Sequence, residues 1–184
     1  MILFCVIPDE QKKHHGLCIT LEDTLFLRIA KGDMQAFESL YYQTYQAVYG
    51  YILSILKNQH DAEDVLQDTY IKIRASAHLY RAQGKPLAWI FTIARNLAYM
   101  QLRREKQFSA YSYEDLQNQL DFSSIEDKET KLLLEAAFSI LTDEERQIII
   151  LHANTGMKHR EIASLLSLPL STVLSKYSRG IKKL

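Results

Sequence analysis

The segment from His159 to Leu184 constrains the fold more than any other part of this chain. Pro169 interrupts it, because proline lacks a backbone N–H and clashes with the preceding helical turn. We therefore expect two short helices around a tight turn, with Ser171 as the N-cap of the second helix. Four apolar residues of that second helix recur at helical spacing and are predicted to face inward: Val173, Tyr177, Ile181 and Leu184.

The opposite side of the second helix is predicted to be open and to carry hydroxyls and cations: Thr172, Ser175, Lys176, Arg179, Lys182 and Lys183. This division is typical of a helix-turn-helix, in which one stripe packs inward and the other enters the major groove of DNA. A C-terminal helical hairpin with a solvated basic face explains the same pattern. Taken alone, the segment favours DNA binding only slightly.

Charge is balanced over the chain but unevenly distributed along it. The 184 residues include 22 Lys and Arg against 22 Asp and Glu, so the protein is not coated with positive charge. Residues 85–106 and those from 158 onward are basic, whereas residues 114–145 are acidic. We therefore expect a polyanion to contact both basic segments and to be repelled by the acidic connector.

The N-terminal residues show no ordered periodicity and are expected to be a disordered tail, or a mis-assigned start, over residues 1–19. Both cysteines lie in this segment, which fits a reducing, cytoplasmic context. The segment lacks the basic n-region that a signal peptide has, so a signal peptide is not expected. The candidate metal ligands in this segment are Cys5, His14, His15 and Cys18. Their spacing matches no common zinc module, so no metal or other cofactor is expected.

Helical periodicity predicts an all-α chain. A first helix is expected from Thr20, as its cap, to Ala30, and Asp33 is expected to cap a longer second helix. Tyrosines of the second helix suggest a base-stacking platform, but their helical spacing favours core and rim positions for most of them: Tyr41, Tyr42, Tyr45, Tyr49 and Tyr51. Asp61 is expected to cap a third helix, whose outer side carries Asp61, Asp64, Gln67 and Asp68. No His or Cys accompanies these carboxylates, which favours a solvated face or a docking face for a basic partner over metal binding or catalysis.

A polar loop, HLYRAQGK at residues 78–85, precedes Pro86, which is well tolerated in the first turn of a helix. The helix that follows combines an apolar set that includes Trp89 with Arg95, Asn96, Arg103 and Arg104. The segment suits contact with a nucleic-acid strand and equally an ordinary core helix with a solvated basic side. Further on, Thr142 and Glu145 predict a capping box before another helix. We expect domains at residues 20–107 and 130–184, joined by a linker at 108–129.

Three motifs, in their order and spacing, resemble those of the extracytoplasmic-function sigma factors of bacteria, over about residues 21–184. The family's polymerase-docking helix is matched by DAEDVLQDTYIKI from Asp61. Its helix that opens and reads the minus-10 element, together with the loop before it, is matched by PLAWIFTIARNLAYMQLRR from Pro86. Its helix-turn-helix for the minus-35 element is matched by HREIASLLSLPLSTVLSKYSRGIKKL.

The resemblance implies two small helical domains, sigma regions 2 and 4, joined by a flexible acidic linker. It implies a non-enzymatic initiation factor with core RNA polymerase, promoter DNA and an anti-sigma factor as partners. The docking set that it implies is Asp61, Asp64, Gln67 and Asp68. The minus-10 set is Leu79, Tyr80, Arg81, Gln83, Lys85, Arg95, Asn96, Arg103 and Arg104. The minus-35 set is Thr172, Ser175, Lys176, Arg179 and Lys183.

The chain departs from the family pattern at three positions, which bears on promoter preference. It has Met100 where Asp is frequent, Ser167 where the turn usually holds Gly, and Leu174 where a basic residue is common. The main alternative is a helix-turn-helix regulator that needs no polymerase, which leaves residues 86–104 unexplained. A protein that binds only other proteins is a second alternative. The sequence contains no phosphate-binding glycine loop and no HExxH or GxSxG motif, so an enzyme is not expected.

Overall fold

The structure, a computed structural model, describes residues 19–109 and 139–184, and within these ranges the chain is helical without strands. The N-terminal group of helices is α1 (Thr24–Ala30), α2 (Met34–Leu56), α3 (Gln59–Ser76), the 3-10 helix η1 (Ala77–Leu79) and α4 (Pro86–Ser109). The C-terminal group is α6 (Asp143–Thr155), α7 (His159–Leu166) and α8 (Leu170–Lys183). The all-α prediction is confirmed. The predicted tail and linker fall almost entirely outside the described residues.

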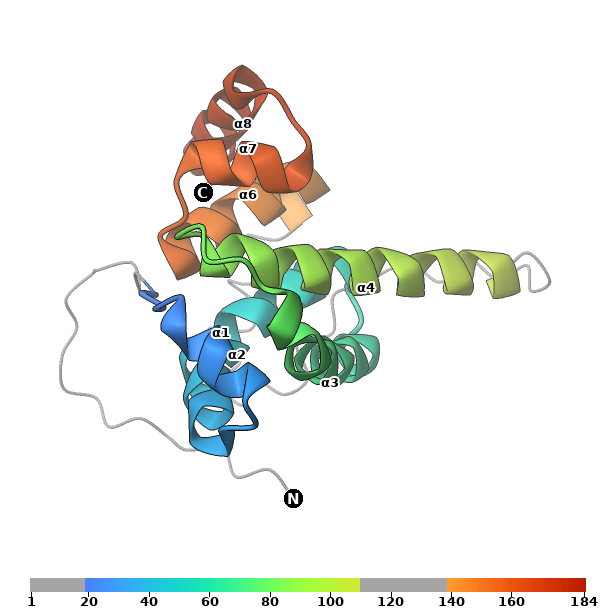
Figure 1. The fold of residues 1–184 in the computed structure, drawn as a ribbon. Coiled ribbons are helices and arrows are strands. Elements are labelled where there is room, and N and C mark those ends of the chain that lie inside the picture. The colour runs from blue at the N-terminus through green and yellow to red at the C-terminus, as the bar shows by residue number, and fades with distance from the viewer. Residues whose placement is uncertain (1–18, 110–138) are drawn as a thin grey trace, which may run out of the picture.

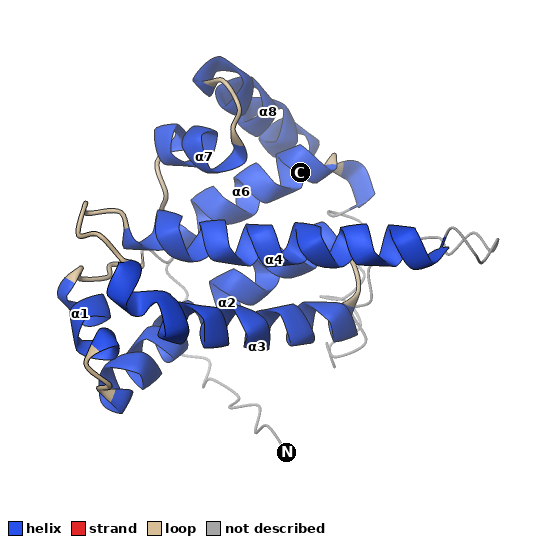
Figure 2. Cartoon of the chain, turned by 45° about the vertical axis from the view of Figure 1, so that its right-hand side comes forward, coloured by secondary structure: helices blue, strands red, loops and turns tan. Residues whose placement is uncertain are grey.

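The long helix α4 crosses the middle of the molecule. Figures 1 and 2 show α1, α2 and α3 on one side of it and α6, α7 and α8 on the other. None of the helices in the described ranges combines the length and the apolar character that crossing a bilayer requires.

Two of the predicted helix caps are present. Asp33 caps α2, and its carboxylate accepts a hydrogen bond from the backbone N–H of Ala36 at 3.0 Å. Thr142 and Glu145 form the capping box of α6, in which each side chain accepts a hydrogen bond from the other residue's backbone N–H. Such bonds satisfy donors that the first helical turn leaves unpaired.

The other three predicted caps are wrong. Helix α1 begins after Asp23 rather than at Thr20. Asn58 caps α3 by accepting a hydrogen bond from the N–H of Asp61, so the helix begins two residues before Asp61. Helix α8 begins at Leu170, directly after Pro169, so Ser171 lies inside its first turn. Proline suits this entry because its fixed φ is compatible with the start of a helix.

The core of the N-terminal group lies between α2, α3 and α4, which pack on one another. It contains fully buried Leu40 and Ile52 of α2, Ile73 of α3, and Ile90 and Phe91 of α4. The prediction that most of the tyrosines lie in the core or at its rim is confirmed. Tyr51 is buried, and Tyr41, Tyr45 and Tyr49 are partly buried against this core. Tyr42 is exposed.

The C-terminal group packs around Ile148 and Leu151 of α6, Ile162 of α7 and Val173 of α8. Helix α8 approaches α6 closely at Gly180, where an added Cβ would lie 2.6 Å from the Cδ1 atom of Ile149. The inward stripe of α8 therefore runs through Val173, Tyr177 and Gly180. The prediction that Ile181 and Leu184 face inward is wrong, since both are exposed. A residue without a side chain lies at the point of closest packing and turns these neighbours outward.

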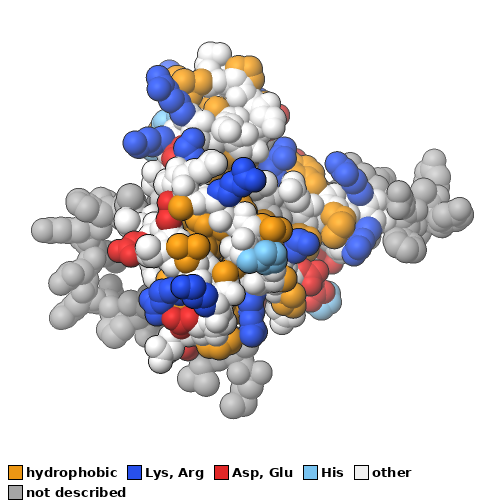
Figure 3. Space-filling model, viewed as in Figure 1, with side chains coloured by type: hydrophobic (Ala, Val, Ile, Leu, Met, Phe, Trp, Pro, Cys, Tyr) orange, Lys and Arg blue, Asp and Glu red, His pale blue; other side chains and the backbone are white. Residues whose placement is uncertain are grey.

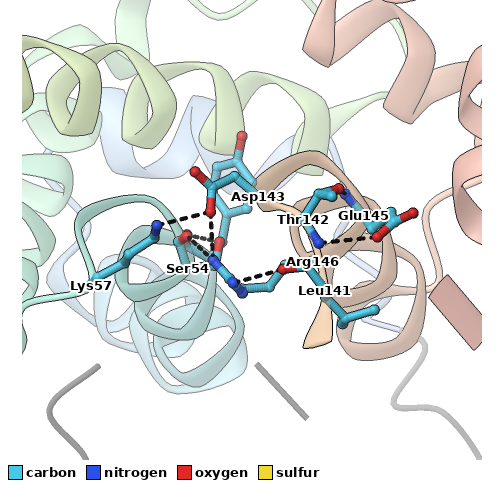
Figure 4. Close-up of polar contacts among 8 residues, drawn as sticks. Ser54, Lys57, Leu141, Thr142, Asp143, Glu145 and Arg146 are labelled. Atoms are coloured by element: carbon cyan, nitrogen blue, oxygen red, sulfur yellow. Dashed lines mark hydrogen bonds and ion pairs between the residues drawn. The ribbon is translucent and has the colours of Figure 1, made fainter. Parts of the chain in front are cut away.

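The two groups of helices contact each other mainly through α2 and α6, and also through α4 and α7. Figure 4 shows the Arg146 guanidinium between them. It donates hydrogen bonds to the backbone carbonyls of Ser54 on α2, at 3.5 Å, and of Leu141, at 3.0 Å, and to the Asp143 carboxylate, at 2.9 Å. Lys57, at the end of α2, forms an ion pair with Asp143 at 3.0 Å. We call this group of residues the domain contact.

Candidate nucleic-acid interface

The loop between η1 and α4 borders a surface hollow of about 330 Å³, which we call the loop pocket. Its walls come from the loop and from the first two turns of α4. The five loop residues of the minus-10 set all line it, together with three residues of α4: Leu79, Tyr80, Arg81, Gln83 and Lys85 with Ala88, Trp89 and Thr92. The pocket thus combines apolar and aromatic walls with cations at its rim.

The residues of the loop pocket differ in exposure. Leu79 is 66% exposed, and Arg81, Gln83 and Lys85 are exposed as well. Tyr80 is buried and forms a wall of the pocket, with its ring edge-on to that of Trp89 at a centroid distance of 5.3 Å. The side chains free to meet a ligand therefore surround an aromatic wall.

A residue that sequence reasoning did not select fixes this loop from behind. Asp23, just before α1, accepts hydrogen bonds from the hydroxyl of Tyr80 and, at 2.9 Å, from the backbone N–H of Gly84. Burial raises the pKa of the Tyr80 hydroxyl, and the Asp23 acceptor raises it further, so Tyr80 keeps its proton. Asp23 precedes its two partners by 57 and 61 residues, and no local pattern indicates the contact.

The remaining minus-10 residues lie along α4. Asn96, Arg103 and Arg104 are exposed, whereas the partly buried Arg95 places its guanidinium 5.0 Å from the centroid of the Tyr99 ring. At 1.5 Å per residue, Arg103 lies roughly 25 Å along the helix from Pro86. Arg103 and Arg104 therefore lie far from the loop pocket. Figure 3 shows lysine and arginine side chains over α4 and over the α7–α8 end of the molecule on one face.

The minus-35 set is only partly on an open surface. Arg179 is 61% exposed, with its Nε atom 4.0 Å from a carboxylate oxygen of Glu145, and Ser175 is exposed with its hydroxyl donating to the carbonyl of Thr172 at 3.1 Å. The expectation that both lysines are open is wrong for Lys176, which is partly buried, whereas Lys183 is exposed but forms an ion pair. Lys176 pairs with Glu144 at 2.7 Å, and Lys183 pairs with Glu145 at 2.6 Å. The acidic first turn of α6 lies beside α8 and attracts these ammonium groups.

Glu145 is the best-connected carboxylate in the C-terminal group. Its side chain is 3% exposed and binds the Lys183 ammonium and the backbone N–H of Thr142. The Lys183 ammonium and the Thr142 amide lower the pKa of Glu145 to about 2. Glu145 therefore stays ionised and ties the end of α8 to the start of α6.

A cluster of three rings supports the helix-turn-helix on its inner side. The imidazoles of His152 and His159 stack at a centroid distance of 4.5 Å, and Tyr177 of α8 lies edge-on to both. Burial, followed by the neighbouring His152, lowers the pKa of His159. In the turn, Ser167 adopts the left-handed conformation with φ 57°, which explains why glycine suits this position.

The docking set lies on α3. Asp64, Gln67 and Asp68 are exposed, whereas the partly buried Asp61 accepts a hydrogen bond from Gln101 of α4 at 3.2 Å. Asp61 therefore lies at the edge of this outer face, towards α4. Among the described residues, no group of three or more His, Cys, Asp or Glu side chains is arranged to hold a metal ion.

Comparisons with known proteins agree with this architecture. Residues 40–108 match the family model of Sigma-70 region 2, and residues 131–184 match that of Sigma-70, region 4. The ECF RNA polymerase sigma factor SigK of Mycobacterium sp. (strain KMS) is 29% identical over 170 residues, which cover 88% of each chain. SigK of Mycobacterium tuberculosis (strain ATCC 25177 / H37Ra) is 28% identical over 170 residues, 88% of this chain and 90% of that one. The chain belongs to the extracytoplasmic-function sigma factors.

Solved structures of sigma factors share the fold. CnrH, in a complex with the cytosolic domain of CnrY, is 21% identical, with a TM-score of 0.64 over 88% of this chain and 93% of that one. The sigma factor RpoE of Bartonella quintana, in a complex with the anti-sigma factor NepR, is 26% identical, with a TM-score of 0.59 over 80% of this chain and 92% of that one.

As an extracytoplasmic-function sigma factor, the protein is a transcription initiation factor that directs core RNA polymerase to promoters and is not an enzyme. Core RNA polymerase and promoter DNA are its partners. The alternative of a polymerase-independent regulator is not favoured, because region 2 is present as well as the helix-turn-helix of region 4.

Proposed function

We propose that this sigma factor holds a base extruded from the minus-10 element in its loop pocket. The observation that carries the proposal is that the loop residues selected from the sequence converge on one hollow, beside Trp89. An extruded base needs an aromatic or apolar wall to replace its stacking neighbours and polar groups to meet its edge. Tyr80 and Trp89 supply the wall, while Arg81, Gln83 and Lys85 supply the polar groups.

The cations of α4 then follow the strand away from the pocket. Asn96 is exposed on the same helix, and Arg103 and Arg104 lie near its other end. Their exposure and charge suit phosphate contacts, which position a nucleic acid without reading its sequence. Arg95, which is partly buried against Tyr99, fits a role in shaping this surface together with contact to the strand.

For the minus-35 element, the exposure of Ser175 and Arg179 on α8 supports direct contact with base edges or phosphates. Thr172, Lys176 and Lys183 belong to the same proposed surface, and the two lysines also hold α8 on α6 through their ion pairs. Leu174, where a basic residue is common in the family, is exposed. An apolar side chain in the major groove suits the methyl group of thymine.

The exposed Asp64, Gln67 and Asp68 on α3 support docking on a basic surface of core RNA polymerase. Asp61 supports this face through its hydrogen bond to Gln101. We assign the two functional domains to residues 20–107 and 130–184, with a tail at 1–19 and a linker at 108–129. The likeness to the complexes of CnrH and RpoE supports an anti-sigma factor as a further partner, and the function supports a cytoplasmic location.

In vitro transcription tests the role directly. Core RNA polymerase is incubated with and without the protein on the fragment upstream of the gene, since genes of this family are often self-regulated. A start site that requires the protein supports the proposal and locates the promoter elements. No start site on this fragment or on a genomic library of fragments, together with failure to co-elute with core polymerase, contradicts it.

Two variants then separate the proposed surfaces on the mapped promoter. The double variant Arg81→Ala, Lys85→Ala should reduce strand opening, measured by permanganate reactivity of unpaired thymines, and leave binding of a minus-35 duplex unchanged. Arg179→Ala should weaken minus-35 binding by about 1–3 kcal/mol if it contacts a base, or lower the salt slope by about one if it contacts a phosphate. The control is Lys31→Ala, an exposed cation on another surface. Unchanged opening or unchanged minus-35 binding contradicts the respective assignment.

A further inference from the structure

Asp23 lies outside the residues matched by the region 2 model and does not line the loop pocket, yet it contacts the loop at both ends. One carboxylate oxygen accepts from the hydroxyl of Tyr80, the first residue after η1. The other accepts from the backbone N–H of Gly84, two residues before Pro86, at 2.9 Å. A single side chain therefore sets the distance between the start and the end of the loop.

The support behind the loop is rigid. Phe26 of α1 is fully buried, with its ring centroid 4.2 Å from that of Tyr80 and 5.2 Å from that of Trp89. Ile29, one turn further along α1, is also buried in the core. Helix α1 thus presents Asp23 from a packed position and holds the two aromatic walls of the pocket against its own core residue.

Within the loop, the Tyr80 hydroxyl oxygen also accepts from the backbone N–H groups of Gln83 and Lys85, so Asp23 acts through the residue on which the loop closes. Between η1 and α4 the loop forms no regular secondary structure. Gly84 has a positive φ of 66°, and because glycine lacks a Cβ its backbone can also adopt other conformations. Hydrogen bonds to a carboxylate are stronger than those between neutral groups, and here both oxygens are used. The Tyr80 hydroxyl remains a donor at neutral pH because burial and Asp23 raise its pKa.

We propose that Asp23 is a positioning residue for promoter opening, which holds the loop in the shape that receives an extruded base. This inference rests on the proposed function of the loop pocket. A loop that is already ordered loses less conformational freedom when it binds, so pre-organisation appears as affinity. Asp23 itself makes no contact with DNA in this proposal and acts through Tyr80 and Gly84.

The test compares Asp23→Ala with Glu22→Ala in the full chain. Glu22 is the matched control, because its carboxylate is one residue away, is exposed and accepts a hydrogen bond from Thr24 rather than from the loop. The probe is a single-stranded non-template oligonucleotide with the minus-10 sequence of the mapped promoter, bound to the assembled holoenzyme. We expect about tenfold weaker binding for Asp23→Ala, equivalent to about 1.4 kcal/mol, and wild-type binding for Glu22→Ala.

Two further measurements report the loop itself in the free protein. Hydrogen exchange at the Gly84 amide should accelerate in Asp23→Ala, because its acceptor is lost. Trp89 is the only tryptophan of the chain, so its fluorescence should become more accessible to acrylamide. Asp23→Asn keeps an acceptor for one donor and should lie between wild type and Asp23→Ala in all three measurements.

The possible outcomes distinguish a failure of the role of Asp23 from a failure of the proposed function of the loop pocket. Minus-10 strand binding within twofold of wild type, with unchanged Gly84 exchange, overturns the role of Asp23 while the loop pocket stands. An equal loss of minus-35 duplex binding in Asp23→Ala indicates general destabilisation and also overturns it. Wild-type holoenzyme that binds the minus-10 strand no better than a scrambled strand refutes the loop pocket and this inference together.

Discussion

The ion pair between Glu145 and Lys183 should make the C-terminal helices sensitive to acid. We consider Glu145→Gln, because glutamine keeps the shape and can still accept from the Thr142 N–H, so mainly the charge is lost. The pKa of Glu145 is about 2 in the folded protein against 4.5 ordinarily. This difference corresponds to at most about 3 kcal/mol of stability. Because the Lys183 side chain reaches solvent and glutamine retains one hydrogen bond, we expect a loss of about 1–2 kcal/mol at pH 7.

The sign of the pH dependence follows from proton binding. Between pH 4.5 and 2 the unfolded chain binds a proton at Glu145 and the folded chain does not, so the stabilisation falls as the pH falls through this window. The assay is urea unfolding followed by circular dichroism at 222 nm, at several pH values from 7 to 3. The difference between wild type and Glu145→Gln should be full above about pH 5.5 and shrink towards pH 3.

The matched control is Glu144→Gln, which removes the same charge at the adjacent position. The Glu144 side chain is half exposed and pairs with Lys176, so we expect a loss of at most about 1 kcal/mol. A double variant with Lys183→Met should show that Glu145→Gln costs clearly less once Lys183 is gone, with a small remainder from the more distant and mostly exposed Arg179. A Glu145→Gln effect that is the same at pH 3 and pH 7, or that persists undiminished without Lys183, would refute the reasoning.

Three further predictions concern other parts of the structure. Ser167→Gly should raise the free energy of unfolding by about 0.5–1 kcal/mol, because glycine adopts the left-handed turn without strain; a loss of stability in urea would contradict this. The lowered pKa of His159 means that the unfolded chain binds its proton first as the pH drops below 6.5, so wild type should lose thermal stability from pH 7.5 to 5.5, and His159→Gln should lose less; parallel profiles would count against it. Lys57→Ala should weaken the domain contact by at most about 1 kcal/mol, because the Lys57 and Asp143 side chains are 25% and 59% exposed. Energy transfer between dyes on α2 and α6 should then fall slightly relative to Lys31→Ala, and an increase would argue against the assignment.

Features that depend on neighbours in sequence were predictable. Asp33 and the Thr142–Glu145 box bind backbone donors three residues away, so the sequence alone contains both partners. The loop residues of the minus-10 set were selected because a polar loop followed by proline and a helix with Trp89 is a local signal, and they line one hollow, while their role stays a prediction.

Features that depend on another helix were missed. The side of α8 on which Ile181 lies is decided by the close approach of α6 at Gly180, which hydrophobic periodicity treats as a gap. The ion pairs of Lys176 and Lys183 were missed, because their carboxylate partners precede them in the sequence by more than thirty residues. Asp23 was not selected, because nothing among its neighbours in sequence indicates the loop that it contacts 61 residues later.

The domain contact has a consequence for every partner of this sigma factor. The Arg146 side chain is buried and bonds to carbonyls and a carboxylate on both sides of the contact (Figure 4), so separating the two domains would expose this side chain and break its bond to α2. A partner that binds both domains in the arrangement of this structure would stabilise that arrangement. A partner that requires another spacing between the loop pocket and α8 binds with an affinity reduced tenfold for every 1.4 kcal/mol of the contact. Changing this contact, for example at Lys57, should therefore change by linkage how strongly two such partners compete for one molecule.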